Sequence, residues 1–335
     1  MKNKIVIFGG AGFIGHNLAL KLAKNKKNKL LIIDDLSVNN INAKQHRSKV
    51  NISLQNQILN NRLKLLKDNN IKLIKKNINN DKKNIEKIVL KFKPNYIYHL
   101  AAVSHATISN IDPIYTYKNS VNTIMNTLEL SRKINSHIIY LSSSMVYGNF
   151  DGKKVTENTL CKPLGIYGNL KLTCENIIKS YNQVFDLKYT IIRPSALYGE
   201  RCISRRVGQI FIENALMDKP IYISGDGEDT LDFTYIDDFT NGLVKILNNK
   251  RAVNQIFNLT YGSARKINDL LKILKVKFSK LKINYTKRDK LTPIRGTLNN
   301  NKIKKLIGHK SIFSIDKGYK KYLNWYLDFY SKNTK

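Results

Sequence analysis

A tyrosine and a lysine four residues apart, Tyr167 and Lys171, form the pattern in this sequence that most directly suggests chemistry. Positions i and i+4 lie on the same face of a helix, so the lysine ammonium can approach the tyrosine phenol. A nearby cation favours the phenolate form of a tyrosine, and a phenolate can remove a proton as a general base. We therefore predict that Tyr167 and Lys171 are catalytic and act on an alcohol.

Three serines at positions 142–144 follow a short apolar run at 137–141. A serine hydroxyl can both donate a hydrogen bond to a reacting alcohol and accept one from it. Residues that follow a strand in a doubly wound sheet face the ligand crevice, so one of these serines is expected beside Tyr167. The alternative is a solvated turn at the end of a strand.

A glycine-rich loop with the spacing G-x-x-G-x-x-G follows the first apolar run, at residues 4–8. Glycines at such a strand-to-helix turn let backbone N–H groups and the helix N-terminus approach a pyrophosphate. The predicted cofactor-binding residues of this loop are Gly9, Gly12, Phe13, Ile14 and Gly15.

Two acids, Asp34 and Asp35, end the second apolar run, at the place where a dinucleotide-binding fold puts its ribose-binding acid. A carboxylate there can accept a hydrogen bond from the 2′-hydroxyl of the adenosine ribose, and it would repel a 2′-phosphate. We therefore predict both residues in the cofactor site and NAD, rather than NADP, as the cofactor. The alternative is that the two acids only cap a turn.

The elements that position these residues alternate along the first half of the chain. Short apolar runs predict strands at 4–8, 29–33, 71–74, 96–100, 137–141 and 189–193, and helical apolar spacing marks 14–24, 84–92, 113–133 and 167–185. Strands joined by helices indicate an α/β fold, here a Rossmann-type doubly wound parallel sheet with a smaller C-terminal α/β substrate domain.

The expected division is an NAD-binding Rossmann domain at 1–193 and a mainly substrate-binding domain at 194–335. The two are expected to interleave, with 226–245 as a segment that can return to the first domain. Residues 39–70 are long, polar and partly helical, which indicates an insertion between the second and third strands.

Composition limits the classes of protein that the chain can belong to. The 42% apolar content is normal for a packed protein, and no apolar run is long enough to predict membrane insertion. Lys and Arg number 58 against 24 Asp and Glu, but the lysines are scattered and often stand beside asparagine. Compositional drift therefore explains the charge of +34 better than a nucleic-acid-binding module, and no specific nucleic-acid partner is expected. A general positive field would still favour an anionic substrate.

The three cysteines, at 161, 174 and 202, form no metal-ligand pattern, so we expect no metal site and a reducing, cytoplasmic location.

These motifs, taken in order, make the chain resemble the extended short-chain dehydrogenase/reductase superfamily, and within it the NAD-dependent nucleotide-sugar epimerase/dehydratase family. The resemblance covers about residues 3–330. Its further motifs are His99-Leu-Ala-Ala, Arg193-Pro with Tyr198-Gly, Gly225-Asp-Gly and the run 232–238. It implies a nucleotide-sugar substrate and the cofactor NAD.

The resemblance also implies roles for single residues. Leu100, Ala101 and Ala102 match the strand end that lines the nicotinamide half of the cofactor. Tyr167 matches the catalytic base, and Lys171 matches the residue that binds the nicotinamide ribose. Counting back four positions from Tyr147, as the family motif runs, places the catalytic serine at Ser143. The substrate-binding residues that we expect are Ser104, Ser144, Arg201, Arg205, Arg206 and Arg288.

The two positions after Ser143 discriminate between reactions of this family. Dehydratases carry Asp-Glu there to eliminate water, and decarboxylases usually keep the Glu. In this chain the residues are Ser144 and Met145, which offer neither an acid nor a base. The motif is therefore similar to that of the 4-epimerases.

Four family positions depart from the pattern. Ala196 stands where an asparagine normally contacts the substrate diphosphate, and Leu231 replaces an arginine with the same task. Asn77 replaces an adenine-contacting aspartate, and Ser120 replaces a common cofactor-loop asparagine. Either the arginines at 201, 205, 206 and 288 hold the phosphates instead, or the substrate has an unusual headgroup.

The expected reaction is inversion of a sugar C4 through a transient 4-ketone. A nucleotide-sugar dehydrogenase or ketosugar reductase with the same three catalytic residues is the alternative, followed by a non-catalytic NAD-binding scaffold. A homodimer is also expected, because helices at 113–133 and 167–185 carry apolar stripes that match the dimer helices of the family, with Ile124, Leu128, Ile177 and Tyr181 in them.

Overall fold

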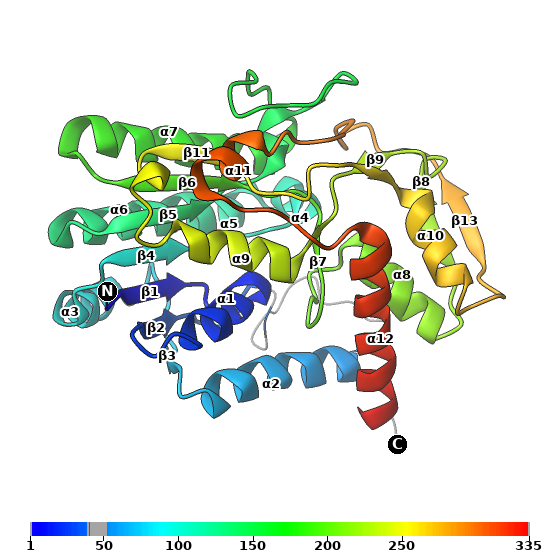
Figure 1. The fold of residues 1–335 in the computed structure, drawn as a ribbon, viewed down its shortest axis with the longest axis horizontal. Helices are drawn as coiled ribbons and strands as arrows, with labels where there is room; N and C mark the ends of the chain where they lie inside the picture. Colours follow the sequence, from blue (N-terminus) through cyan, green and yellow to red (C-terminus); the bar gives the residue numbers. More distant parts are fainter. Residues whose placement is uncertain (1, 39, 41–51, 334–335) are drawn as a thin grey trace.

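A seven-stranded parallel sheet lies at the centre of the computed structural model, which describes residues 2–38, 40 and 52–333 (Figure 1). The strand order is β11-β6-β5-β4-β1-β2-β3, and every neighbouring pair is parallel. The strands are β1 (Lys4–Phe8), β2 (Lys29–Ile33), β3 (Lys72–Ile74), β4 (Tyr96–His99), β5 (His137–Leu141), β6 (Tyr189–Arg193) and β11 (Gln255–Asn258). The predicted α/β fold and doubly wound sheet are confirmed, and the seventh strand was not predicted.

Both faces of the sheet are buried, because successive side chains of a strand point to opposite faces. In β1, Ile5 and Ile7 pack on one face, and Val6 and Phe8 pack on the other. The first face is covered by α1 (Phe13–Ala23), α9 (Ile236–Ile246) and α11 (Asn301–Ile307), and the second by α3 (Lys82–Phe92), α6 (Thr123–Ile134) and α7 (Gly165–Phe185).

The helix predicted at 113–133 is interrupted in the structure. It consists of α5 (Pro113–Tyr117), a π-helical turn at Lys118–Asn122 and α6, and α4 (Ala106–Ile111) precedes it. The apolar side chains of α6 do not form an outward stripe, because Ile124 and Leu128 are fully buried against the sheet. The prediction that these two residues belong to an intermolecular surface was wrong, since the sheet itself is their partner.

A second core lies beside the carboxyl ends of the strands. It contains α8 (Val207–Leu216), α10 (Ile267–Lys275) and α12 (Ile315–Asn333), packed around aromatic residues such as Tyr319 and Tyr322. Short strand pairs complete it: β7 (Leu197–Tyr198) with β10 (Thr234–Tyr235), β9 (Thr230–Leu231) with β12 (Arg265–Lys266), and β8 (Ile221–Ser224) with β13 (Ile283–Thr286). The division at residue 193 stays a prediction, and α9 and β11 both lie in the layers of the main sheet.

The predicted insertion contains helix α2 (Ile52–Asp68), whereas its residues 39 and 41–51 lie outside the described part of the chain. Leu54, Ile58 and Leu59 of α2 join the second core, and Figure 1 shows the helix running from below α1 to α12. The insertion therefore bridges the two cores.

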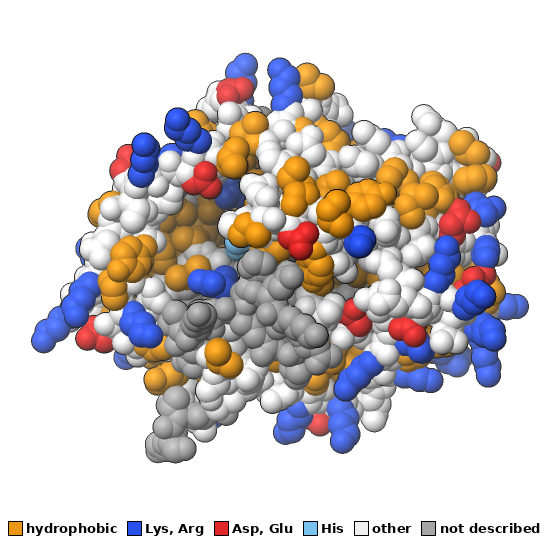
Figure 2. Space-filling view, turned by 180° about the vertical axis from the view of Figure 1, so that it is seen from behind, with side chains coloured by type: hydrophobic (Ala, Val, Ile, Leu, Met, Phe, Trp, Pro, Cys, Tyr) orange, Lys and Arg blue, Asp and Glu red, His pale blue; other side chains and the backbone are white. Residues whose placement is uncertain are grey.

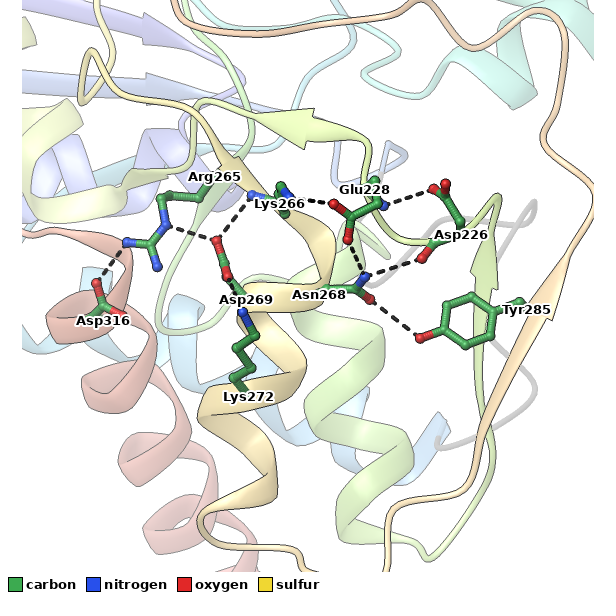
Figure 3. Close-up of polar contacts among 9 residues, drawn as sticks. All are labelled: Asp226, Glu228, Arg265, Lys266, Asn268, Asp269, Lys272, Tyr285 and Asp316. Carbon is green, nitrogen blue, oxygen red and sulfur yellow. Dashed lines mark hydrogen bonds and ion pairs between the residues drawn. The ribbon is translucent and has the colours of Figure 1, made fainter.

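A network of charged side chains joins the first turns of α10 and α12 on the surface (Figure 3). Arg265 Nε lies 2.9 Å from Asp269 Oδ2, and its Nη1 lies 2.9 Å from Asp316 Oδ2. Carboxylates are favourable at helix N-termini, and each of these helices carries one in its first turn. Arg265 therefore links the starts of the two helices through their acids.

Among the helices in the described ranges, none is long and apolar enough to cross a membrane.

Candidate active site

A cavity of about 430 Å³ opens at the carboxyl ends of β1, β2, β4 and β5 and reaches the second core. Most of the predicted site residues line it together: Gly9, Gly12, Phe13, Ile14, Gly15, Asp34, Asp35, Leu100, Ala101, Ala102, Ser104, Ser143, Ser144, Tyr167, Lys171, Arg205 and Arg206. Residues far apart in sequence meet here because the ends of parallel strands share one edge of the sheet.

The glycine loop packs too tightly for side chains. Gly9 has φ +75°, and a Cβ at this position would lie 2.7 Å from the Ala101 nitrogen. A Cβ at Gly15 would collide with the Gly9 carbonyl, so α1 can approach β1 only because residue 15 is glycine. No side chain in the described ranges caps the N-terminus of α1 at Gly12. An uncapped helix start beside glycines suits a phosphate, whose oxygens can accept the backbone N–H groups.

The acid at the end of β2 is fixed by backbone hydrogen bonds. The Ala11 N–H donates to Asp34 Oδ2 at 2.9 Å, and the Leu36 N–H donates to Oδ1 at 2.8 Å. Burial raises the pKa of Asp34 to about 6, although these two N–H groups and the positive charge of Arg62 pull it down. Asp34 therefore holds a turn and also lines the cavity, and its contact with the cofactor ribose stays a prediction.

Asp35, like Asp34, both holds a turn and lines the cavity. It accepts hydrogen bonds from the Ser37 backbone at 2.9 Å and from the Asn77 side chain, and it lines the cavity with Asn77. Ser120, the other departure near the cofactor, is buried in the π-helical turn and is not among the lining residues.

The predicted catalytic residues Ser143, Tyr167 and Lys171 all line the cavity. Lys171 Nζ donates to the Leu141 carbonyl at 2.7 Å and lies 6.0 Å from the centre of the Tyr167 ring. Tyr167, Lys171 and Ser143 are all less than a tenth exposed. Their side chains therefore meet where β5 ends and α7 begins.

A glycine allows this close approach. A Cβ at Gly168 would lie 2.8 Å from the Met145 carbonyl, so α7 could not pack against the 3₁₀ turn Ser144–Tyr147 with a larger residue there. The Met145 N–H donates to Ser143 Oγ at 3.2 Å, which fixes the serine at the start of the same turn. The backbone thereby brings the hydroxyl and the phenol to one cavity wall.

Two of the predicted substrate arginines do not line the cavity. Arg201 Nε donates to His16 Nε2 at 3.0 Å, and Arg288 pairs with Asp229 at 2.9 Å. The structure instead brings Arg62 and Arg295 to the cavity, two residues that sequence reasoning missed. In the sequence, Arg295 lies in a Pro-Ile-Arg-Gly run that indicates only a turn, and nothing marks Arg62.

Comparison with known proteins identifies the family. Residues 5–260 match the model of the NAD-dependent epimerase/dehydratase family, and the chain belongs to this family. It is 32% identical to a proposed UDP-glucose 4-epimerase of Methanocaldococcus jannaschii over 81% of both chains, and 31% identical to an uncharacterised UDP-glucose epimerase of Bacillus subtilis over 76% of both. The family resemblance seen in the sequence is confirmed.

Solved structures agree with this assignment. The UDP-glucuronic acid 4-epimerase of Bacillus cereus, in complex with UDP-glucuronic acid and NAD, has a TM-score of 0.88 and 26% identity and matches 98% of this chain and 100% of its own. The UDP-glucose 4-epimerase of Thermotoga maritima has a TM-score of 0.84 and 25% identity, over 97% and 99%. The cofactor of the family is NAD, and the uncapped start of α1, the glycine loop and Asp34 fit it.

Proposed function

We propose that this chain inverts C4 of a UDP-linked sugar with NAD as the cofactor. The observation that carries the proposal is the meeting of Ser143, Tyr167 and Lys171 in one cavity that is also lined by the glycine loop and Asp34. The relatives named above are UDP-sugar 4-epimerases by name, and they share the length and fold of this chain.

The residues of the chain divide the proton chemistry between them. Tyr167, as the phenolate, removes the proton from the C4 hydroxyl, and Ser143 holds that oxygen with a hydrogen bond. The Lys171 ammonium, held by the Leu141 carbonyl, lies 6.0 Å from the centre of the Tyr167 ring. Held by the glycine loop, Asp34 and Lys171, NAD would supply the acceptor for the C4 hydride in the oxidation and its donor in the reduction. Tyr167 then returns the proton to the C4 oxygen as the ketone is reduced, which forms the inverted alcohol.

The residues after Ser143 explain why elimination of water does not follow the oxidation of C4. A dehydratase needs an acid and a base beside C5 and C6, and here Ser144 and Met145 occupy the two positions after Ser143. The acids among the described lining residues are Asp34, Asp35 and Asp289, and none of them lies in this turn. The ketone is therefore left to be reduced again.

The anionic part of the substrate is assigned to a group of arginines on the side of the second core. Arg205, Arg206 and Arg295 line the cavity together with Ala196 and Leu231, the two positions where the usual phosphate contacts are missing. Arg206 Nη2 donates to the Ser104 carbonyl at 2.5 Å, which fixes its direction. Arginine binds phosphate oxygens through two N–H groups at once, so these side chains can replace the missing contacts.

Outside the site, we propose a homodimer, a cytoplasmic location and no specific nucleic-acid partner. Helices α5 and α7 keep exposed apolar side chains, including Ile114, Tyr117 and Val184, that a second copy could cover. The three cysteines are free thiols, as in a reducing compartment. Figure 2 shows Lys and Arg side chains scattered over the face it draws rather than gathered in one patch.

The test of the function is incubation with UDP-glucose, UDP-galactose, UDP-glucuronic acid and UDP-N-acetylglucosamine, followed by NMR of the sugar products. Inversion at C4 without accumulation of NADH is the expected result. Accumulation of NADH in proportion to product would show the dehydrogenase instead, and no reaction with any nucleotide sugar would contradict the proposal.

A further inference from the structure

An arginine of the insertion helix α2 lines the cavity beside Asp34. Arg62 is 1% exposed, and its Nε and Nη2 both donate to the Arg201 carbonyl, at 2.9 and 2.5 Å. Its third nitrogen, Nη1, is buried and has no hydrogen-bond partner among the residues that the structure describes. Buried polar groups nearly always have a partner, so the position of Nη1 requires an explanation.

The charge of Arg62 is not neutralised by a direct ion pair within the described residues. Their ion pairs include none with Arg62, and Asp34 attracts it only at longer range. Burial lowers the pKa of Arg62 to about 10, so the side chain remains a cation at neutral pH. A buried cation that lacks an ion pair is costly, and an anion bound in the cavity would offset that cost.

A chain of contacts fixes Arg62 relative to the glycine loop. The Arg201 carbonyl accepts from Arg62, while the Arg201 side chain donates to His16 Nε2 at 3.0 Å. His16 Nδ1 lies 2.8 Å from the Gly12 carbonyl. Burial and the charges of Arg62 and Arg201 hold the pKa of His16 well below its usual value, so the ring is neutral and Nδ1 carries the proton. Helix α2 is thereby connected to the phosphate-binding turn.

We infer that Arg62 is a cofactor-binding residue whose Nη1 donates to the diphosphate of the ADP half of NAD. Three observations on the described residues support this inference: Nη1 has no acceptor among them, the buried cation has no ion pair with them, and hydrogen bonds connect Arg62 through Arg201 and His16 to the start of α1. The diphosphate is the anionic part of NAD, and guanidinium–phosphate contacts are among the stronger hydrogen bonds in proteins. The insertion thus contributes a ligand of its own to a site otherwise built by the main sheet.

The test is calorimetric titration of NAD, ADP and adenosine into protein freed of retained nucleotide. Arg62→Met, which keeps an apolar stem of similar length, is expected to weaken ADP and NAD by about tenfold to a hundredfold, because a charge-assisted hydrogen bond is lost. Adenosine, which has no phosphate, should change by less than about twofold. Arg62→Lys should lie between, since lysine keeps the charge but loses the planar fork. Arg132→Met, on the exposed side of α6, is the matched control.

Two results would overturn the inference: an Arg62→Met protein that unfolds as cooperatively as the native chain and binds ADP equally well, or an equal loss for adenosine. Should Arg62→Met fail to fold, the native chain decides the matter by NMR of the guanidinium nitrogens, assigned with Arg62→Lys. ADP must then shift the Arg62 signal, and an unmoved signal refutes the contact. ADP binding needs no sugar chemistry, so the two proposals can fail separately. The Arg62 contact can be refuted while epimerisation is observed, and epimerisation can be refuted while Arg62 binds ADP.

Discussion

Arg193 and Glu175 form a buried two-point ion pair between the end of β6 and the middle of α7. Nε lies 2.9 Å from Oε1 and Nη2 lies 2.6 Å from Oε2, and both side chains are almost fully buried. Burial opposes the charge of Arg193, but hydrogen bonds and attraction to Glu175 outweigh it and raise the pKa of the arginine. Ser142 Oγ donates to the same carboxylate at 2.5 Å, so the pair also holds the residue next to Ser143.

We expect Glu175→Gln to be strongly destabilising. Removing one partner of a buried pair leaves the other charge uncompensated, which costs about 3–5 kcal/mol. Asp68→Asn removes one partner of the exposed pair with Lys64 and should cost less than about 1 kcal/mol. Urea unfolding of both variants measures the difference, and similar losses in the two would show that the pair contributes little to stability.

The ion pair illustrates what the sequence could and could not predict. Arg193 stood in a recognisable motif, but its partner Glu175 lies 18 positions away on a helix, and no local pattern connects them. The strands and the glycine loop were predictable because their signals are local: apolar runs of strand length, and glycines where a chain turns. Strand β11 was missed because it lies in the second half of the chain, where apolar runs no longer alternate regularly with helical segments.

Arginines were the least predictable part of the site. Arg288 and Arg295 are equally basic in sequence, yet Arg288 is neutralised by Asp229 and Arg295 lines the cavity. The difference depends on which acid the fold brings near each one. The assignment of Ile124 and Leu128 to a dimer surface was wrong for a comparable reason. An apolar stripe of a helix has the same spacing whether it covers a sheet or a second subunit.

Preference for NAD over NADP should depend on pH through Asp34. The pKa of this buried acid is about 6, above its ordinary value of about 3.9, so the folded chain holds the proton more tightly than the unfolded chain. The contribution of Asp34 to stability is therefore greatest below about pH 4 and is lost as the pH rises to about 6. In the same range the acid gains the charge that repels a 2′-phosphate, so discrimination should increase towards neutral pH.

Titration of NAD and NADP at about pH 5.5 and about pH 8 measures this preference. A phosphate monoester itself takes up a proton near pH 6, so Asp34→Asn provides the baseline. The native chain should gain discrimination with pH beyond the gain of the variant. Equal profiles for the two proteins would remove Asp34 from cofactor selection.

Arginine substitutions should separate the cavity from its surroundings. Arg206→Met and Arg295→Met are each expected to raise the KM for a UDP-sugar about tenfold or more, because each removes a charge-assisted contact with phosphate. Arg288→Met removes an equal charge outside the cavity and should leave KM nearly unchanged. Initial rates at varied substrate concentration provide the comparison. If Arg288→Met had the largest effect, the assignment of the substrate phosphates to the cavity arginines would be wrong.

The phenol of Tyr167 is the final point at which the proposed chemistry can be tested. Tyr167→Phe removes the general base while keeping the ring, so turnover should fall by about 10²–10⁴-fold with NAD binding largely intact. Tyr181→Phe removes a hydroxyl from the same helix at a position bonded to Glu129 and should have little effect on turnover. Lys171→Ala should weaken both turnover and NAD affinity, and Met145→Ala should cost little because Met145 has no proton to transfer. Rates of C4 inversion by NMR, with NAD titrations of each variant, provide both readouts. Full activity of Tyr167→Phe on any accepted sugar would eliminate Tyr167 as the base and, with it, the mechanism proposed for this cavity.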